Sequence, residues 1–142
     1  MRRIRFKARS LNTGEMVEGY YAHQHFANFD ADGSHITSYD EKDAIFNDEP
    51  SNRNGPYWVN IDPDTLCQQT SMDDMFQLPI WEHDIVRLYS IRDSEQSLHD
   101  QTGEVIFLQT AFAVRFEDGS NHTLSYLRRH YDVQIIGNAF DL

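Results

Sequence analysis

Apolar and polar residues alternate most strictly near the start of this 142-residue chain, over residues 2–9. Side chains alternate between the two faces of a strand, so Ile4, Phe6 and Ala8 fall on one face. Most of the cations among Arg2, Arg3, Arg5, Lys7 and Arg9 fall on the other face. The pattern predicts an amphipathic strand with a solvated basic face, as edge strands commonly have.

Two turn signals divide the next part of the chain into strands. The first is the Asn-Thr-Gly at residues 12–14, and the second is residues 30–34, which contain an Asp-Gly pair. Asp-Gly is typical of the tight turn in a β-hairpin. We therefore expect one strand from about residue 16 to 29 and a return strand over residues 36–39, which together form an antiparallel sheet.

The composition changes over residues 40–57, which are acidic, rich in Asn, Pro and Gly, and nearly free of apolar periodicity. Such a segment predicts a mobile loop between ordered elements. Apolar residues return at Tyr57, Trp58, Val59 and Ile61. Directly after them, Asp62-Pro63 has the pattern of an N-cap followed by proline at the first helical position, which predicts a short helix.

The second half of the chain contains several short apolar runs separated by polar turns. The segment 85–91 is apolar enough for a central strand, and residues 103–107 and 111–116 predict two more strands, the last closed by an Asp-Gly turn at 117–120. Residues 124–129 fit either one helical turn or a strand. A final strand is expected around Val133, Ile135 and Ile136, ending at Gly137-Asn138. Short strands with glycine turns predict a small barrel or a strongly bent sheet.

The predicted fold class is therefore mainly β, with antiparallel N-terminal hairpins, a small C-terminal barrel and at most one or two short helices. We expect an N-terminal subdomain over residues 1–60 and a barrel subdomain over 61–142, together forming one compact unit, because single domains commonly have roughly 100 to 150 residues. No internal repeat and no low-complexity tract interrupts this organisation.

Charge and cysteine content narrow the class of protein. The net charge is -11, from 12 Lys and Arg against 23 Asp and Glu, with a pI of about 4.8. This charge opposes direct binding to a nucleic-acid backbone. The single cysteine, Cys67, cannot form an intrachain disulfide, and no apolar run is long enough for a signal peptide or a membrane span. The sequence predicts a soluble cytoplasmic protein with no membrane partner.

Several short stretches, in order along the whole chain, resemble the YopX family of phage and prophage proteins. The corresponding family stretches look like IKFRAWD, DPETVGQYTG, IYEGDIV, G-x-V and EVIGNIYENPEL. The matching stretches here are IRFKA at 4–8, Gly19-Tyr20, DPDTLCQQT at 62–70, IWEHDIVRL at 80–88, Gly103 with Val105, and VQIIGNAFDL at 133–142.

The resemblance implies a β-rich fold whose later half is similar to an SH3-like barrel, and a bacterial host that carries a prophage. It implies no established activity. Three positions depart from the family, because Cys67, Ser71 and His83 stand where the family usually has glycine. The turn before Asp84 must therefore accommodate a side chain in place of glycine.

The strongest metal-ligand pattern is His23-Gln24-His25, which places two imidazoles on one face of a strand and is followed by Asp30, Asp32 and His35. Histidine with carboxylate is suitable zinc chemistry. An exposed polar strand has the same composition, so His23, His25, Asp30 and Asp32 are retained only as candidates, and no metal or other cofactor is predicted. Residues 28–33 also imitate the start of an EF-hand loop, but the twelfth position is Tyr39 instead of glutamate, and a hairpin turn explains them better.

Two other groups of residues resemble functional sites. The first group has the residue types of a hydrolase, namely Cys67, a histidine (His83 or His130) and an aspartate (Asp62 or Asp84). No nucleophile motif surrounds the cysteine, and a free cysteine is more often a buried core residue. We therefore predict no catalytic residue and favour a protein that is not an enzyme. An aromatic platform for single-stranded nucleic acid is the second arrangement, although these rings are more simply core residues. They are Tyr57, Trp58, Trp81, Tyr89, Phe107, Phe112 and Phe116.

The favoured function is a non-enzymatic, prophage-encoded interaction module that forms a homo-oligomer or binds a host or phage protein, because strand edges and small barrels readily assemble. One alternative is an acidic protein that mimics phosphate charge and binds a nucleic-acid-handling host protein. Another is a metal-binding protein or hydrolase built on His23, His25, Asp30 and Asp32. The acidic surface of the first alternative is expected from Asp40, Glu41, Asp43, Asp48, Glu49, Asp73 and Asp74.

Overall fold

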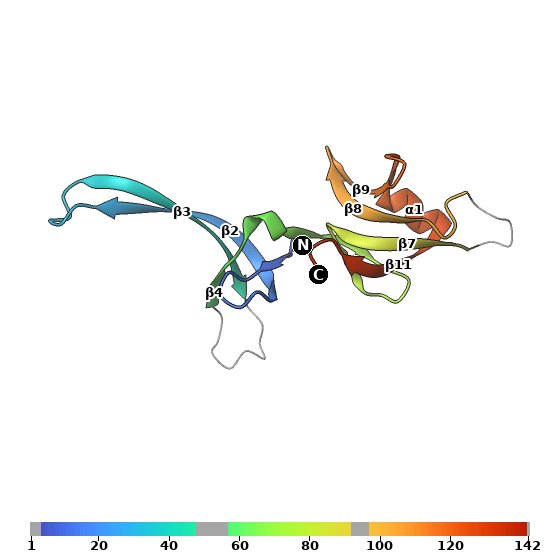
Figure 1. The fold of residues 1–142 in the computed structure, drawn as a ribbon, viewed down its shortest axis with the longest axis horizontal. Coiled ribbons are helices and arrows are strands. Elements are labelled where there is room, and N and C mark those ends of the chain that lie inside the picture. The colour runs from blue at the N-terminus through green and yellow to red at the C-terminus, as the bar shows by residue number, and fades with distance from the viewer. Residues whose placement is uncertain (1–3, 48–56, 92–96, 142) are drawn as a thin grey trace. The chain divides into compact units, whose positions relative to one another are not determined.

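The computed structural model describes residues 4–47, 57–91 and 97–141 and is mainly β (Figure 1). This confirms the predicted fold class at its coarsest level. The chain divides into two compact units, residues 1–66 and residues 67–142. The described strands are β1 (Phe6–Arg9), β2 (Met16–Phe29), β3 (Ile36–Asn47), β4 (Tyr57–Asn60), β5 (Cys67–Asp73), β6 (Pro79–Trp81), β7 (Asp84–Ser90), β8 (Thr102–Leu108), β9 (Ala111–Phe116), β10 (Asn121–Thr123) and β11 (Tyr131–Asn138).

In the first unit the strands lie in the order β4-β3-β2-β1, and every neighbouring pair is antiparallel. Its core is formed by Ala8, Ile45, Val59 and Ile61, against which Phe6 packs. The apolar face predicted for the first strand is therefore buried at Ala8 and half-buried at Phe6, whereas Ile4 is exposed.

The short helix expected at Asp62-Pro63 is a 3-10 turn, η1 (Pro63–Thr65). Its N-cap is Asp62, whose carboxylate accepts the amide of Asp64 at 3.1 Å. Proline is tolerated at the start of the turn because its missing N–H has no partner there. The capping pattern read from the sequence is thus confirmed, and this turn lies at the end of the first unit.

The loop predicted over residues 40–57 is wrong for its first part, because β3 continues to Asn47. Its polar residues pair across the hairpin with β2, where Asp43 lies opposite His23 and Glu41 opposite His25. Such cross-strand partners stabilise a strand whose own sequence lacks apolar periodicity. Tyr57 begins β4, and residues 48–56 of the expected loop lie outside the described residues.

In the second unit, β5 and β6 form an antiparallel pair, and five more strands lie in the order β10-β9-β8-β7-β11. Residues 124–129, which fitted either a helix or a strand, belong to helix α1 (Leu124–His130). Its buried residues Leu124 and Leu127 join the core with Leu88, Val105 and other strand residues. Among the described strands, the five-stranded order ends at β10 and β11, with no closing pair between them. No helix in the described part of the chain is long and apolar enough to cross a membrane.

Two buried polar residues that lie far apart in the sequence meet in this unit. Asp84, at the start of β7, accepts the backbone amide of Trp81 at 2.8 Å and the side-chain amide of Asn138 at 3.0 Å. Asn138 ends β11, so the last strand includes Gly137, and a β-bulge separates Ile135 from Gly137. The strand end predicted at Gly137-Asn138 is confirmed, and the bulge keeps Asn138 in register with Asp84.

Left-handed backbone occurs at five described non-glycine residues of the second unit, and these include two of the three positions at which the family resemblance leads us to expect glycine. Ser71 has φ +69° and His83 has φ +70°. In contrast, Cys67 is completely buried at the start of β5. A non-glycine residue at positive φ costs roughly 1–2 kcal/mol, so the backbone at Ser71 and His83 favours glycine for a physical reason.

Candidate functional site

The β2–β3 hairpin extends well beyond the rest of its sheet (Figure 1). Strand β1 pairs with β2 only between Met16 and Gly19, and β4 pairs with β3 only between Ala44 and Asn47. We call residues 23–43 the hairpin arm. Within the arm the two strands pair with each other and, among the described strands, with no third strand.

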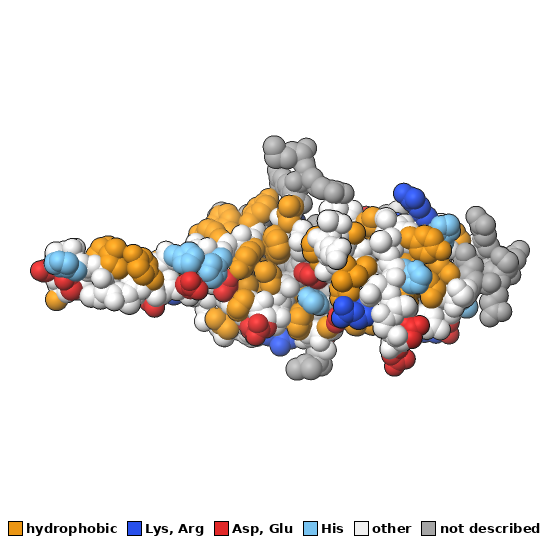
Figure 2. All heavy atoms as spheres, turned by 90° about the horizontal axis from the view of Figure 1, so that it is seen from above, with side chains coloured by type: hydrophobic (Ala, Val, Ile, Leu, Met, Phe, Trp, Pro, Cys, Tyr) orange, Lys and Arg blue, Asp and Glu red, His pale blue; other side chains and the backbone are white. Residues whose placement is uncertain are grey.

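A ladder of polar side chains lies on one face of the arm, where β2 and β3 leave the core. His23 lies opposite Asp43 and His25 lies opposite Glu41, so all four side chains share a face. His23 Nδ1 is 2.8 Å from Asp43 Oδ1, and His23 Nε2 is 3.6 Å from Glu41 Oε2. His25 Nδ1 is 3.4 Å from Glu41 Oε1. Figure 2 shows histidine and acidic side chains together at this point of the arm.

Asp43 joins this ladder to the core, because it also accepts a short hydrogen bond from the Tyr21 hydroxyl. Burial, followed by the hydrogen bond to Asp43, raises the pKa of Tyr21 to about 12. The hydrogen bond to Asp43 raises the pKa of His23 above its ordinary value. The bonds from Tyr21 and then from His23 lower the pKa of Asp43. The carboxylate is thus held ionised between two donors.

The structure separates the four metal candidates of the sequence into two groups. His23 and His25 lie with Glu41, whereas Asp30 and Asp32 lie with His35 at the end of the hairpin. Asp30 lies five positions after His25, which in an extended strand is roughly 17 Å. Glu41 was missed as a partner of the histidines because the return strand was expected to end at Tyr39. The hairpin register would have placed it opposite His25.

The second group is a hydrogen-bonded turn, which confirms the hairpin reading of residues 30–34. Asp32 accepts the amide of Ser34 at 2.9 Å, and the amide of Gly33 donates to the carbonyl of Asp30 at 3.0 Å. Side-chain hydrogen bonds, first with Asp30 and then with Ser34, lower the pKa of Asp32 to about 2. These carboxylates already accept bonds that shape the turn, so their clustering has a structural cause.

The residue types of the hydrolase arrangement have separate roles. Cys67 is completely buried, and Asp84 holds Trp81 and Asn138. The His83 ring lies against Phe140 at a centroid distance of 5.0 Å, with Nδ1 3.9 Å from Glu104. Asp62 caps η1 in the first unit, and the His130 ring lies against Tyr126.

The seven aromatic residues considered as a platform are spread over both units. In the second unit Trp81 and Phe116 are buried in the core, while Phe107 is exposed. In the first unit Tyr57 and Trp58 are exposed on β4. Phe112 is packed against the core, and Tyr89 donates a hydrogen bond to Gln134. Most of these rings therefore have a packing or hydrogen-bonding role.

Two of the carboxylates expected on an acidic surface are engaged inside their units. Asp74 is buried and accepts the amides of Phe76, Leu78 and Ile135 at 2.9 to 3.2 Å. Asp43 accepts bonds from Tyr21 and His23, as described above. Asp48 and Glu49 lie outside the described residues. Asp40, Glu41 and Asp73 are exposed.

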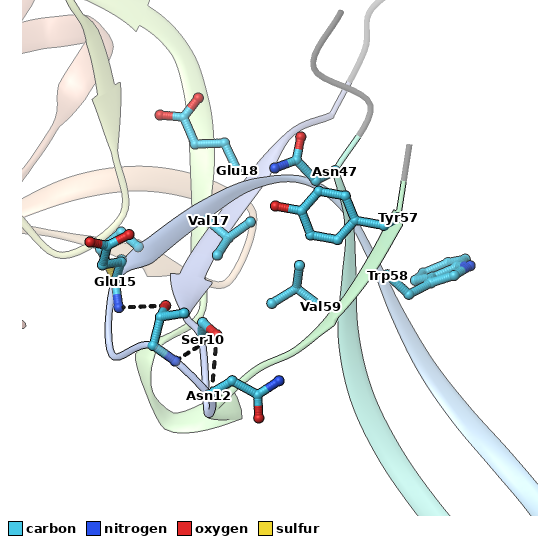
Figure 3. A pocket seen from close by; sticks show the side chains of 11 residues that line it. Ser10, Asn12, Glu15, Val17, Glu18, Asn47, Tyr57, Trp58 and Val59 are labelled. Atoms are coloured by element: carbon cyan, nitrogen blue, oxygen red, sulfur yellow. Dashed lines mark hydrogen bonds between the residues drawn. The ribbon is translucent and has the colours of Figure 1, made fainter. Parts of the chain in front are cut away.

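The first unit also contains a pocket of about 530 Å³ between the β1–β2 turn and β4 (Figure 3). Ser10 shapes this turn, since its amide donates to the carbonyl of Glu15 at 2.8 Å and its hydroxyl accepts the amide of Asn12 at 3.2 Å. Among the described residues, those that line the pocket include Glu15, Glu18 and Tyr57, and none of them is a histidine, cysteine, lysine or arginine. The described lining therefore offers hydrogen-bonding groups and negative charge.

The fold and the polar ladder define a mainly β protein with a projecting hairpin arm. No family model matches the chain, and no curated protein matches it. A solved structure, that of protein EF1440 from Enterococcus faecalis, is similar to 97% of this chain and 94% of that chain, at 19% sequence identity and a TM-score of 0.44. A likeness at this level carries no argument about function.

Substitution of Asp43 by asparagine is expected to lower two pKa values at once. Loss of the carboxylate returns the pKa of His23 toward 6.5 and that of Tyr21 from about 12 toward 10. NMR titration of the imidazole and ultraviolet titration of the phenol measure the two values. Asp40→Asn, on the opposite face of the arm, is the matched control and is expected to leave both unchanged.

The same pair makes stability depend on pH in a defined window. The contribution of Asp43, whose pKa is lowered from 3.8, is present above pH 3.8 and is lost as the pH falls through the lowered value. The contribution of His23 to stability, which arises because its pKa is raised from 6.5, is present below pH 6.5. It is lost as the pH rises through the raised pKa. The stability difference between the wild type and Asp43→Asn is thus largest between pH 3.8 and 6.5. An equal difference at all pH values would contradict this assignment.

Proposed function

We propose that this protein is a non-enzymatic, self-assembling module that pairs with a second copy of itself through the hairpin arm. The observation that carries the proposal is the arm itself, in which none of residues 23–43 is buried. A two-stranded hairpin is at best marginally stable in water, and further strands or a packed surface are needed to stabilise it. A ribbon of this length is therefore best explained by a surface that covers it in an assembly.

The arm also exposes large apolar side chains. Phe29 is 57% exposed and Tyr39 is 65% exposed, and Phe26 and Ile36 are exposed as well. Figure 2 shows hydrophobic side chains along one face of the arm, between two groups of histidines. Apolar side chains concentrated on a narrow ribbon are typical of a contact surface.

Backbone geometry favours β2 as the pairing edge. The amide of Ile61 donates to the carbonyl of Asp43 at 3.0 Å, so the backbone groups of Asp43 point away from β2. Its cross-strand partner His23 therefore points its own N–H and C=O away from β3. With the strand period of two, the same holds for His25 and Ala27. These outward groups form a template for another strand.

Charge distinguishes the two edges of the arm. The β2 segment from residue 25 to 29 reads HFANF and contains no carboxylate, lysine or arginine, whereas β3 carries Asp40, Glu41 and Lys42 in succession. Charged residues on an edge strand oppose pairing with another copy. Two β2 edges pair antiparallel about a two-fold axis, which is the commonest symmetry of homodimers. The occupant that best fits this edge is therefore the same edge of a second chain.

The resemblance to the YopX family supports a prophage origin for this module. The left-handed backbone at Ser71 and His83, at two usual family glycines, is one supporting observation. The contact between Asp84 and Asn138 is another, because it joins the stretches that look like IYEGDIV and EVIGN. The second unit, with its short antiparallel strands and single described helix, is proposed to be related to the SH3-like barrels that the family implies.

Light scattering on the untagged protein tests the assembly at two salt concentrations. We expect a particle of twice the 16.6 kDa chain mass at both, because main-chain pairing and apolar contact depend weakly on salt. Ala27→Pro removes an outward N–H without breaking a bond between β2 and β3, and is expected to give a monomer. Tyr39→Pro places the same block on the opposite edge, where it is expected to leave the dimer intact.

Three outcomes would count against this function. A monomeric wild-type particle at both salt concentrations removes self-assembly. A dimer that survives Ala27→Pro but not Tyr39→Pro moves the contact to β3. A dimer that dissociates only at high salt would show that the contact between the copies is formed by charged groups and not by apolar side chains and main-chain hydrogen bonds.

A further inference from the structure

We propose that His23, His25 and Glu41 form a binding site for a divalent metal ion of the zinc class. The three side chains project from one face of the arm, where the histidines lie two residues apart on β2 and Glu41 lies opposite His25 on β3. Their ligand atoms all lie within 4.8 Å of one another. Two imidazoles and a carboxylate are a three-ligand set of the kind found in open zinc sites, which leave the fourth position to water.

The separations between the ligand atoms match the size of a coordination sphere. Zinc binds nitrogen and oxygen at about 2.0–2.2 Å, which places two ligand atoms of a tetrahedral site roughly 3.4 Å apart. The distance from His23 Nε2 to Glu41 Oε2 is 3.6 Å, and that from His25 Nδ1 to Glu41 Oε1 is 3.4 Å. The two imidazole rings lie nearly perpendicular, with centroids 4.9 Å apart. Small rotations of these side chains suffice to direct all three ligand atoms at one ion.

An outer hydrogen bond orients the first histidine for this role. Asp43 Oδ1 lies 2.8 Å from His23 Nδ1, and Asp43 is itself held by the Tyr21 hydroxyl. Histidine ligands in metal sites nearly always donate their second ring N–H to a carboxylate or carbonyl, which fixes the tautomer and leaves the other nitrogen free to bind. With Nδ1 committed to Asp43, the lone pair of Nε2 faces Glu41. In the turn at residues 30–35, the Nδ1 of His35 lies 2.7 Å from Ser34 Oγ and 3.2 Å from Asp30, which is itself one of the three possible ligands of that group.

Charge and access also suit a cation. Glu41 and Asp43 bring two negative charges to the site, which balance a divalent ion. The arm has a single lysine and no arginine, and Lys42 lies on the opposite face, with its Nζ 5.5 Å from the centre of the Phe26 ring. The side chains of His25 and Glu41 are each 60% exposed, so an ion reaches the site directly from solvent.

Calorimetric titration of the untagged full chain with Zn²⁺ alone, at neutral pH, tests the site. One equivalent is expected to bind, and Co²⁺ in its place is expected to give the visible absorption of a four-coordinate ion. His25→Gln and Glu41→Gln should each weaken binding roughly 100-fold, and Asp43→Asn roughly tenfold, as outer partners do. All of these side chains are on the surface or partly so, and circular dichroism checks that the variants keep the fold.

His35→Gln is the matched control, because it alters a histidine beside two carboxylates on the same arm. It should leave the affinity unchanged. The proposal is overturned if no stoichiometric binding is seen, if binding survives His25→Gln and Glu41→Gln, or if His35→Gln abolishes it. The site does not rest on self-assembly, and repeating the titration with the Ala27→Pro variant separates the two properties.

Discussion

Asp84→Ala is expected to lower the free energy of unfolding of the second unit by about 4 kcal/mol, because two buried hydrogen-bond donors lose their common acceptor at once. The substitution leaves the backbone N–H of Trp81 and the side-chain amide of Asn138 without the acceptor that holds them at 2.8 and 3.0 Å. Neither group is able to reach water easily, since both residues are buried. The two segments that they join then separate more readily.

Denaturant unfolding followed by tryptophan fluorescence measures this loss for the second unit alone. The chain has two tryptophans, and a Trp58→Phe background leaves the buried Trp81 as the reporter. Asp73→Ala, which removes an exposed carboxylate from the same unit, is the matched control and should change stability by no more than about 0.5 kcal/mol. A double-mutant cycle with Asn138→Ala should give a coupling of about 1 kcal/mol or more. Equal effects of Asp84→Ala and Asp73→Ala would show that Asp84 is not an anchor.

Local chemistry was sufficient to predict several elements from the sequence. The Asp-Gly turn at residues 30–34, the cap at Asp62 and the turn at residues 117–120 each depend on side chains that bond within a few positions. The strand at 85–91 was evident because its apolar residues fill the core of the second unit. In each case the physical cause lies within the segment that shows the pattern.

The features that were missed depend on partners far away in the sequence. Residues 40–47 read as a loop because DEKDAIFN carries little strand signal, yet Ala44 and Ile45 are buried by neighbouring strands. The same error hid the candidate site. Once β3 is extended, the antiparallel register places Glu41 opposite His25 and Asp43 opposite His23, and the metal candidates regroup accordingly.

Two glycines in the stretches that resemble the family also depend on contacts that the local sequence does not reveal. Gly19 and Gly103 were noted only as residues that match family stretches, since no local turn requires them. In the structure, each lies where a neighbouring strand passes too closely for a side chain. A Cβ at Gly19 would lie 2.0 Å from the carbonyl oxygen of Phe46, and one at Gly103 would lie 2.6 Å from that of Arg115. This requirement arises only from the packed sheet.

Gly19→Ala is accordingly expected to destabilise the first unit by about 3 kcal/mol, because the new methyl group would overlap a main-chain carbonyl. A main-chain atom cannot rotate away as the end of a side chain can. The Gly19 φ of +159° adds to the strain of an added side chain. The residue is the last one of β2 that pairs with β1, so a shift of β2 here should also disturb the register of the hairpin arm. Hydrogen exchange measured by mass spectrometry reports protection in β2 and β3 separately from the second unit.

Gly14→Ala is the matched control, because Gly14 also has positive φ, at +75°, but nothing lies within 4 Å of its Cβ position. It should cost only the strain of the left-handed backbone, about 1 kcal/mol. In the second unit, Gly103→Ala and Gly137→Ala form the corresponding pair, with close backbone at Gly103 and open space at Gly137. Loss of protection in β2 and β3 with Gly19→Ala but not Gly14→Ala would assign the effect to the close approach of the strands. Equal losses of protection with Gly19→Ala and Gly14→Ala would assign the effect to backbone strain. The polar ladder of the arm would then depend on the turn at residues 12–14 instead of on the close approach of β2 and β3 at Gly19.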